Sequence, residues 1–138
     1  MSVPPHELFG KNIEMSIFSK KQTGDAGEDF CAKYLKKHGY KILSRNYKKP
    51  YGEIDIIAFK NGVLCFVEVK TRNDQSLTRA YEAVDYRKQQ RIIKAAQAYL
   101  IDNPNDYMCR FDVCEVYIVK DTLKVLEINY IENAFEMR

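Results

Sequence analysis

Histidine is scarce in this chain, and its cysteines are not spaced as metal-binding pairs. The 138 residues include two histidines and four cysteines, without a CxxC motif. A structural zinc site needs four such ligands at close spacing, and a disulfide framework is typical of small secreted domains. Neither is expected here. We interpret the cysteines as buried apolar side chains in a reducing cytoplasm: Cys31, Cys65, Cys109 and Cys114.

Long apolar runs and a strong charge imbalance are also missing. A membrane-spanning helix needs about 18 consecutive apolar residues, whereas Asp55 and Glu68 interrupt the best candidates here. The start of the chain, MSVPPHELFG, has no basic stretch followed by an apolar block, so we expect no signal peptide, no membrane partner and a cytoplasmic protein. The 22 basic and 19 acidic residues give a net charge of +3, which permits a polyanionic partner without requiring one.

The length and the patterning predict one folded domain. Residues 1–22 contain a Pro-Pro pair and a basic cluster, and we expect an irregular N-terminal extension there, before a single domain over 23–138. A helix is predicted from Asp25 as its N-cap to Gly39 as its terminator. Periodicity and turn residues then predict strands over 41–49, 53–60 and 63–71, an exposed polar loop over 72–82, a helix over about 83–102, and strands over 109–119 and 122–131. This order predicts an α/β protein with a mixed central sheet flanked by helices.

The second and third strands carry acidic residues inside apolar runs. Asn61-Gly62 is the dipeptide most typical of a two-residue hairpin loop. If it forms that loop, Lys60 faces Val63, and further pairing places Asp55 opposite Glu68. Opposed residues of an antiparallel ladder project to the same face, with Cβ atoms about 4.5–5.5 Å apart. Because the third strand is apolar on both faces, we expect the two carboxylates to lie together in a cleft.

Two adjacent buried carboxylates repel each other unless a cation lies between them or one of them is protonated. Mg²⁺ (or Mn²⁺) suits such a pair, because hard cations bind one or two carboxylates together with water and phosphate oxygens. Lys70, two residues beyond Glu68 on the same face, would reach a phosphate or water at the metal. The simpler alternative stays open: these charges lie exposed at strand edges, with Glu53 opposite Lys70 as an ion pair.

Both predicted helices place a polar residue on their apolar stripe. Glu28 precedes Cys31, Ala32 and Leu35 at helical spacing, which puts it on the buried side. The same spacing also fits a capping box in which Glu28 bonds back to the N-cap amide of Asp25, and the two interpretations do not exclude each other.

Gln89 likewise lies on the sheet-facing stripe of the second helix, ahead of Ile92 and Ile93. A basic side runs beside it, which is either a solvated face or a surface for a phosphodiester backbone. The candidate nucleic-acid-binding cations are Arg45, Lys48, Lys49, Arg72, Arg79, Arg87, Lys88, Arg91 and Lys94.

Several blocks in this order then carry a resemblance over about 23–135: GDAGEDFCAKYL, GYKILSRNYK, GEIDIIA, FVEVKTR, AVDYRKQQRI, RFDV and IENAF. With Asp55…Glu68-Val69-Lys70, they resemble the YraN family of small bacterial proteins. That family is similar to archaeal Holliday-junction resolvases and to the PD-(D/E)xK nuclease superfamily. The resemblance implies a restriction-endonuclease-like αβββαβ core.

The resemblance also implies roles for individual residues. Asp55 and Glu68 would bind the divalent metal, with help from the Val69 carbonyl, and Lys70 would position or activate the attacking water. One departure is Ile54, where the superfamily pattern has proline before the aspartate; that proline supplies no chemistry.

Two helix residues complete the implied site. Glu28 would be the helix carboxylate beside the metal, and Gln89 the helix residue found near it in resolvase-like relatives.

Three functions follow as hypotheses. The first is a Mg²⁺-dependent endonuclease that hydrolyses phosphodiester bonds of DNA, branched or otherwise structured, and a homodimer would suit a four-way junction. The second is a nucleic-acid-binding module with the nuclease fold that acts with a partner or does not cleave. The third is a scaffold whose charges only form ion pairs.

Overall fold

The computed structural model describes residues 18–73, 84–119 and 121–137. Its elements are α2 (Lys20–Lys37), β1 (Lys41–Lys49), β2 (Gly52–Lys60), β3 (Val63–Asn73), α3 (Tyr86–Asp102), β4 (Met108–Ile118) and β5 (Val125–Phe135). The predicted α/β class and element order are therefore confirmed. Most of the expected N-terminal extension and of the loop over 72–82, including Arg79, lies outside the described residues.

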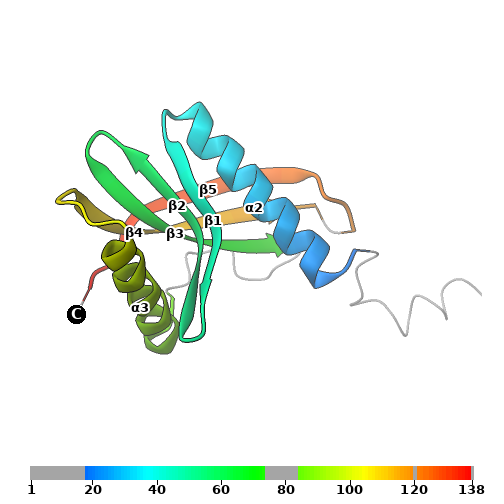
Figure 1. Ribbon diagram of the computed structural model, residues 1–138. Coiled ribbons are helices and arrows are strands. Elements are labelled where there is room, and N and C mark those ends of the chain that lie inside the picture. Colours follow the sequence, from blue (N-terminus) through cyan, green and yellow to red (C-terminus); the bar gives the residue numbers. More distant parts are fainter. Residues whose placement is uncertain (1–17, 74–83, 120, 138) are drawn as a thin grey trace, which may run out of the picture.

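The five strands form one sheet in the order β1-β2-β3-β4-β5 (Figure 1). Strands β3 and β4 are parallel, and the other neighbours are antiparallel, so the sheet is mixed as predicted. Helix α3 lies in the connection between the two parallel strands, which need such a crossover. None of the helices among the described residues is long and apolar enough to cross a bilayer.

Each helix covers one face of the sheet with its own core (Figure 1). Strand β3 contributes to both cores by alternation: Leu64 and Phe66 pack under α3, whereas Cys65 and Val67 pack under α2. The strand is thus covered on both sides, as predicted from its two apolar faces. The helix side chains buried in these cores are Ile92, Ile93, Ala95 and Ala96 of α3 and Cys31, Ala32 and Leu35 of α2.

Helix α2 begins earlier than predicted. Its N-cap is Ser19, whose hydroxyl accepts from the Gln22 amide (3.0 Å) while the Gln22 side chain accepts from the Ser19 amide (2.9 Å). The prediction of Asp25 as N-cap is wrong, because this capping box already satisfies the first amides. Asp25 lies inside the helix and pairs with Lys21 at 2.9 Å. The predicted end is confirmed, with Gly39 in the left-handed region (φ 88°).

The predicted hairpin between β2 and β3 is confirmed. The turn residues Asn61-Gly62 have φ of 50° and 77°, as a two-residue turn of this kind requires. Lys60 pairs with Val63, and the ladder continues in that register as far as Ile56 opposite Val67.

The last strand begins and ends later than the predicted 122–131. The Thr122 hydroxyl donates to the Val119 carbonyl (2.8 Å) and accepts from the Lys124 amide (3.1 Å), so these residues form a turn instead of a strand. Cys109 is exposed near the start of β4, contrary to the interpretation of all cysteines as buried. It lies beside Met108, which is also exposed to solvent.

Two glycines let the helices approach the sheet closely. A side chain on Gly27 of α2 would overlap the Thr71 hydroxyl of β3. A side chain on Gly52 of β2 would overlap the main-chain carbonyl of Arg91 in α3. Both contacts hold the helices against the sheet in the region of the predicted acidic residues.

Candidate metal and nucleic-acid site

The two central carboxyl groups lie where β2 and β3 stop pairing. The regular ladder ends at Ile56, one residue before Asp55. Asp55 accepts a hydrogen bond of 2.8 Å from the Val69 main-chain amide. The expectation of a regular ladder pair is therefore wrong, because the Asp55 side chain bonds to the β3 backbone. The Asp55 and Glu68 carboxyl groups are nevertheless close enough for each to change the pKa of the other.

Burial governs the ionisation of this pair. Loss of solvent raises the pKa of Glu68 to about 8, and the negative charge of Asp55 adds to the rise. Burial also raises the pKa of Asp55, against the Val69 amide and the Lys88 ammonium, which lower it. Without a cation, burial and the charge of Asp55 therefore favour the protonated form of Glu68 at neutral pH.

Glu68 faces α3. Its Oε1 lies 3.6 Å from Nζ of Lys88, and only 8% of the residue is exposed. Strand alternation places Lys70 on this same face, and its positive charge also lowers the pKa of Glu68. The pair with Glu53, which the simpler alternative invoked, is not part of the β2–β3 ladder; Glu53 instead lies opposite Lys48 of β1.

Asp55 also borders a cleft on the α2 side. The cleft has a volume of about 870 Å³ and lies between the N-terminal half of α2 and the carboxyl end of β3. Glu28 and Thr71 line it together with Asp55 and Val69. Asp55 therefore lies toward the α2 side of the sheet, and Glu68 lies toward the α3 side.

Glu28 is buried and bound to β1. Its Oε1 accepts from Nε of Arg45 (3.1 Å) and from Nδ2 of Asn46 (3.0 Å). Burial raises the pKa of Glu28, the Arg45 hydrogen bond lowers it, and the charge of Asp55 raises it. Of the two interpretations of Glu28, the buried stripe is confirmed and the capping box with Asp25 is wrong.

Gln89 lies in the first turn of α3 and is half-buried. Its side-chain Nε2 donates to the Val84 carbonyl at 2.7 Å, so the amide bonds to the chain entering its own helix. Its role beside the acidic pair stays a prediction.

The donor set fits a hard cation better than zinc. Among residues 18–73, 84–119 and 121–137, no three His, Cys, Asp or Glu side chains are grouped to hold a metal. A Mg²⁺ site needs no such triad, because two carboxylates, a main-chain carbonyl, waters and substrate oxygens suffice. Two neighbouring carboxyl groups, one of which burial favours in its protonated form, match this chemistry, since a divalent cation can replace the proton.

Most of the predicted nucleic-acid-binding cations that the structure describes fall into two groups. Arg87, Arg91 and Lys94 of α3 are exposed and lie at helical spacing on one side; we call them the α3 basic stripe. The second group forms ion pairs with carboxylates of the chain: Arg45 with Glu28 and Asp29 (3.1 and 2.7 Å), Lys49 with Asp102 (3.8 Å), Arg72 with Glu115 (3.4 Å) and Lys88 with Glu68 (3.6 Å).

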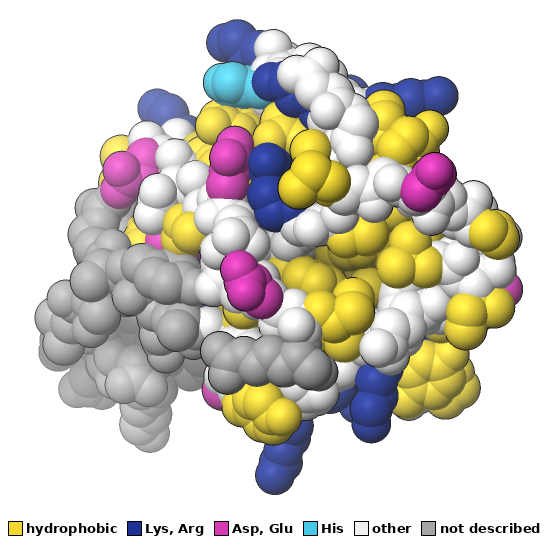
Figure 2. Space-filling view, turned by 90° about the vertical axis from the view of Figure 1, so that its left-hand side faces the viewer, with side chains coloured by type: hydrophobic (Ala, Val, Ile, Leu, Met, Phe, Trp, Pro, Cys, Tyr) yellow, Lys and Arg dark blue, Asp and Glu magenta, His cyan; other side chains and the backbone are white. Residues whose placement is uncertain are grey.

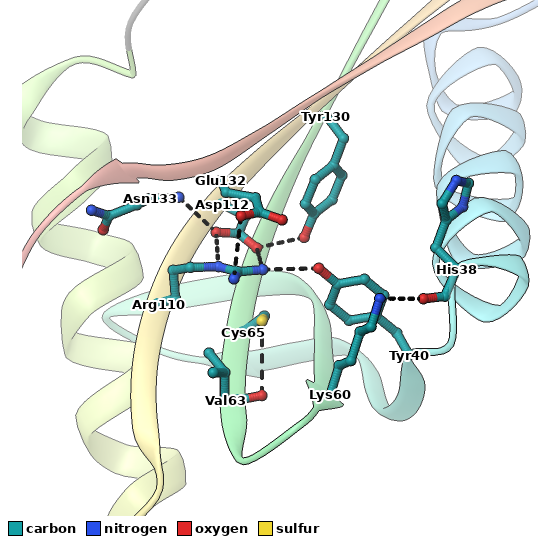
Figure 3. A network of polar contacts seen from close by, with 10 residues as sticks. All are labelled: His38, Tyr40, Lys60, Val63, Cys65, Arg110, Asp112, Tyr130, Glu132 and Asn133. Atoms are coloured by element: carbon teal, nitrogen blue, oxygen red, sulfur yellow. Dashed lines mark hydrogen bonds and ion pairs between the residues drawn. The ribbon is translucent and has the colours of Figure 1, made fainter.

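Two fully buried acids of β4 were missed by the sequence reasoning. Asp112 accepts from Arg110 (2.8 and 2.9 Å), from the Tyr130 hydroxyl (2.6 Å) and from the Asn133 amide (2.9 Å) (Figure 3). Glu115 accepts from Asn129 Nδ2 at 2.9 Å. The available signal was a charged residue inside an otherwise apolar strand, as in RFDV. Both Asp112 oxygens accept hydrogen bonds, and those from Tyr130 and Asn133 connect β4 with β5. We therefore assign this network a structural role.

An apolar hollow marks the end of the sheet where β3 and β4 begin. Figure 2 shows the face at the left of Figure 1, on which apolar side chains gather around a hollow. A cleft of about 480 Å³ at this end is lined by Val63, Met108 and Met137 among others. This cleft is separate from the acidic pair, because Glu68 follows Val63 by five residues along β3.

These observations define an α/β protein with a five-stranded mixed sheet between two helices and a pair of neighbouring carboxyl groups where β2 and β3 stop pairing. The model of the uncharacterised protein family UPF0102 matches residues 27–116. The chain belongs to this family, which confirms the resemblance to YraN.

Relatives of the same family name span nearly the whole chain. A UPF0102 protein of Caldanaerobacter subterraneus is 46% identical over 88% of this chain and 100% of its own length. One from Dictyoglomus thermophilum is 44% identical, covering 85% of this chain and 99% of the relative. One from Chlorobium phaeobacteroides is 40% identical, covering 82% and 92%.

Proposed function

We propose that this protein is a Mg²⁺-dependent endonuclease of the PD-(D/E)xK superfamily that hydrolyses phosphodiester bonds of DNA, with branched or structured DNA as its substrate. The observation that carries the proposal is the electrostatically coupled pair of Asp55 and Glu68 at the end of a strand ladder, where the charge of Asp55 and burial raise the pKa of Glu68 to about 8. Lys70 follows on the same face of β3. The element order α2-β1-β2-β3-α3-β4 matches the core expected of that superfamily.

The chain's own groups divide the work of such a site. Asp55, Glu68 and the Val69 carbonyl would hold Mg²⁺, which when bound polarises a phosphate and lowers the pKa of its water. Lys70 places an ammonium beside Glu68, where it orients a water and offsets charge that develops on the phosphate. The α3 basic stripe binds backbone phosphates of the same substrate, since exposed Arg and Lys side chains supply most non-specific affinity for DNA.

One contact favours a second candidate, a nucleic-acid-binding module that keeps this fold but does not cleave or acts with a partner. Lys88 lies 3.6 Å from Glu68 and already offsets part of its charge. Together with protonation of Glu68, Lys88 stabilises the pair without a divalent cation. Binding of DNA without cleavage under any divalent metal would support this candidate over the endonuclease.

The test is cleavage of supercoiled and of branched DNA in the presence of Mg²⁺ or Mn²⁺. Glu68→Ala and Lys70→Ala should each lower the cleavage rate about 100-fold or more, as general acid–base and electrostatic groups do. Glu136→Ala and Lys36→Ala remove the same side chains at exposed positions and should cut like the parent. Equal cutting by all five proteins would exclude Glu68 and Lys70 from the mechanism.

A melting experiment tests metal binding without activity. A ligand that binds only the folded state raises the melting temperature by mass action. Mn²⁺ should therefore raise the melting temperature of the parent and have no effect on Glu68→Ala. An equal shift in both proteins would place the metal elsewhere.

A further inference from the structure

Strand β1 breaks its alternation beside the acidic site. Arg45 and Asn46 are consecutive residues of β1, yet both donate to Oε1 of Glu28 (3.1 and 3.0 Å). In a regular strand consecutive side chains point to opposite faces. Asn46 has φ of 54°, in the left-handed region that few residues other than glycine adopt. This backbone conformation turns the Asn46 carboxamide onto α2.

The partner strand changes its alternation at the same rung. Ile54 and Ile57 of β2 both pack in the core under α3, whereas Ile56 packs under α2. Regular alternation would put Ile54 and Ile56 on one face. The residue between these two is Asp55, which bonds to the Val69 amide at this irregularity.

The register brings the two irregular residues to the same level of the sheet. Arg45 pairs with Ile56 and Tyr47 pairs with Ile54, and Asn46 and Asp55 are the two residues between these pairs, where the ladder is interrupted. Asn46 is therefore associated with both acids that border the α2-side cleft: it bonds to Glu28, and it lies at the level of Asp55 in the β1–β2 ladder.

We propose that Asn46 is a positioning residue of the acidic site, whose left-handed backbone and carboxamide hold Glu28 toward the cleft that Asp55 borders. The inference rests on the proposed function in one respect, namely that this cleft receives a divalent cation. Groups outside the coordination shell that orient acidic residues typically change metal affinity by about 10-fold to 100-fold. Arg45 shares the task but bonds to Asp29 as well, whereas the Asn46 carboxamide bonds to Glu28.

The rival explanation is that Asn46 only shapes the strand. Asparagine tolerates the left-handed region better than other residues with a side chain, and glycine adopts it freely. Asn46→Gly therefore keeps the backbone and removes the carboxamide, which separates the two roles. Asn61→Gly is the matched control, because Asn61 has nearly the same φ (50°) in the remote hairpin turn.

The experiment measures Mn²⁺ affinity by electron paramagnetic resonance, cleavage kinetics, and the carboxyl titration of Glu28 by NMR in metal-free protein. Asn46→Gly should bind Mn²⁺ roughly 10-fold more weakly, with kcat lowered and KM for DNA unchanged. It should also raise the pKa of Glu28 further, because the ionised form loses a hydrogen bond. Asn61→Gly should match the parent in all three.

A double substitution tests whether Asn46 acts through Glu28. In a Glu28→Gln background, Asn46→Gly should weaken Mn²⁺ binding no further, because residues that act through one contact are not additive. A full additional loss would overturn the inference. If Asn46→Gly does not fold, Asn46→Asp serves instead: it tolerates the same backbone and should raise the pKa of Glu28 by repulsion.

The remaining outcomes separate this inference from the proposed function. Parent-like Mn²⁺ affinity and an unchanged Glu28 titration in Asn46→Gly overturn the positioning role, even if the parent cleaves DNA. Failure of the parent to bind Mn²⁺ or to cut overturns the proposed function. The Glu28 titration then decides the positioning role on its own, since it needs no metal.

Discussion

The ammonium of Lys88 in α3 lies 3.6 Å from the carboxyl group of Glu68 in β3. Lys88 is 38% exposed at its side chain, whereas the side chain of Glu68 is 10% exposed. The helix thus brings a cation to an acid that burial has pushed toward its protonated form. A proton, the Lys88 ammonium and a divalent cation would therefore compete to neutralise the charge of Glu68 and Asp55.

Glu68 should make the protein less stable as the pH rises. Burial and Asp55 raise its pKa in the folded state from 4.5 to about 8. Between about pH 4.5 and 8 the folded state therefore keeps this proton, whereas the unfolded chain has lost it. The contribution of Glu68 to the free energy of unfolding is complete below about pH 4.5 and is lost as the pH rises to about 8. Glu68→Gln should remove this loss and be more stable than the parent by about 1 kcal/mol or more at pH 8. Urea unfolding at several pH values measures it.

The control for this pH dependence is Glu136→Gln, an exposed carboxylate. Its stability should follow the parent at every pH. A parent whose free energy of unfolding rises between pH 5 and 8 would contradict the assigned direction of the Glu68 pKa.

Gly52 should not tolerate a side chain. A methyl group there would overlap the Arg91 carbonyl of α3, and a main-chain atom can move only with its helix. We expect Gly52→Ala to lower stability by about 1–3 kcal/mol, as overpacking does. Gly24→Ala is the opposite case: the glycine lies inside α2 with open space around it, and alanine should stabilise the helix by about 0.5–1 kcal/mol. Thermal melting of both variants tests this difference. A change of melting temperature in the same direction for both would contradict the close packing at Gly52.

Removal of the buried Asp112 carboxylate should lower the free energy of unfolding strongly. Asp112 is 0% exposed and neutralises Arg110 at 2.8 Å. Asp112→Asn removes the buried counter-charge of that cation and should cost about 3–5 kcal/mol. Glu132→Gln removes the outer partner of the same arginine, at 3.5 Å with 61% exposure, and should cost less than about 1 kcal/mol. Chemical unfolding of the two variants compares them directly, and similar losses would argue against a buried charge network.

The α3 basic stripe should account for part of the salt dependence of DNA binding. Each phosphate contact changes the slope of log K against log salt by about 0.9 for duplex DNA. Replacing Arg87, Arg91 and Lys94 with glutamine should weaken binding and flatten this slope. Replacing Lys36, Lys37 and Lys41 changes the net charge equally on another exposed surface. Titrations at several salt concentrations distinguish the stripe from a general charge effect, which would affect both triple variants alike.

Short-range patterns predicted most of the fold. The Asn61-Gly62 turn, the Gly39 helix end and the apolar faces of β3 depend on neighbours in sequence, and all three are confirmed. The start of α2 was missed because Ser19 and Asp25 both suit an N-cap, and the choice depended on the reciprocal bonds of Ser19 with Gln22.

The site was predictable to a lesser degree. The hairpin register indicated that Asp55 and Glu68 lie close together, but it placed them on a regular rung. The bond of Asp55 to the Val69 amide and the turn of Asn46 onto Glu28 depend on residues 14 and 18 positions away. No local pattern reports such contacts.

The amino-acid sequence by itself determined the order of the elements, the two-sided burial of the central strand and the closeness of two acids, because each of these follows from side-chain periodicity and turn chemistry. Only the tertiary structure decided which cations are neutralised, which strand residues leave their alternation, and which acids meet α2 or α3. Those outcomes depend on charges and hydrogen-bond partners that chain folding brings together from distant positions.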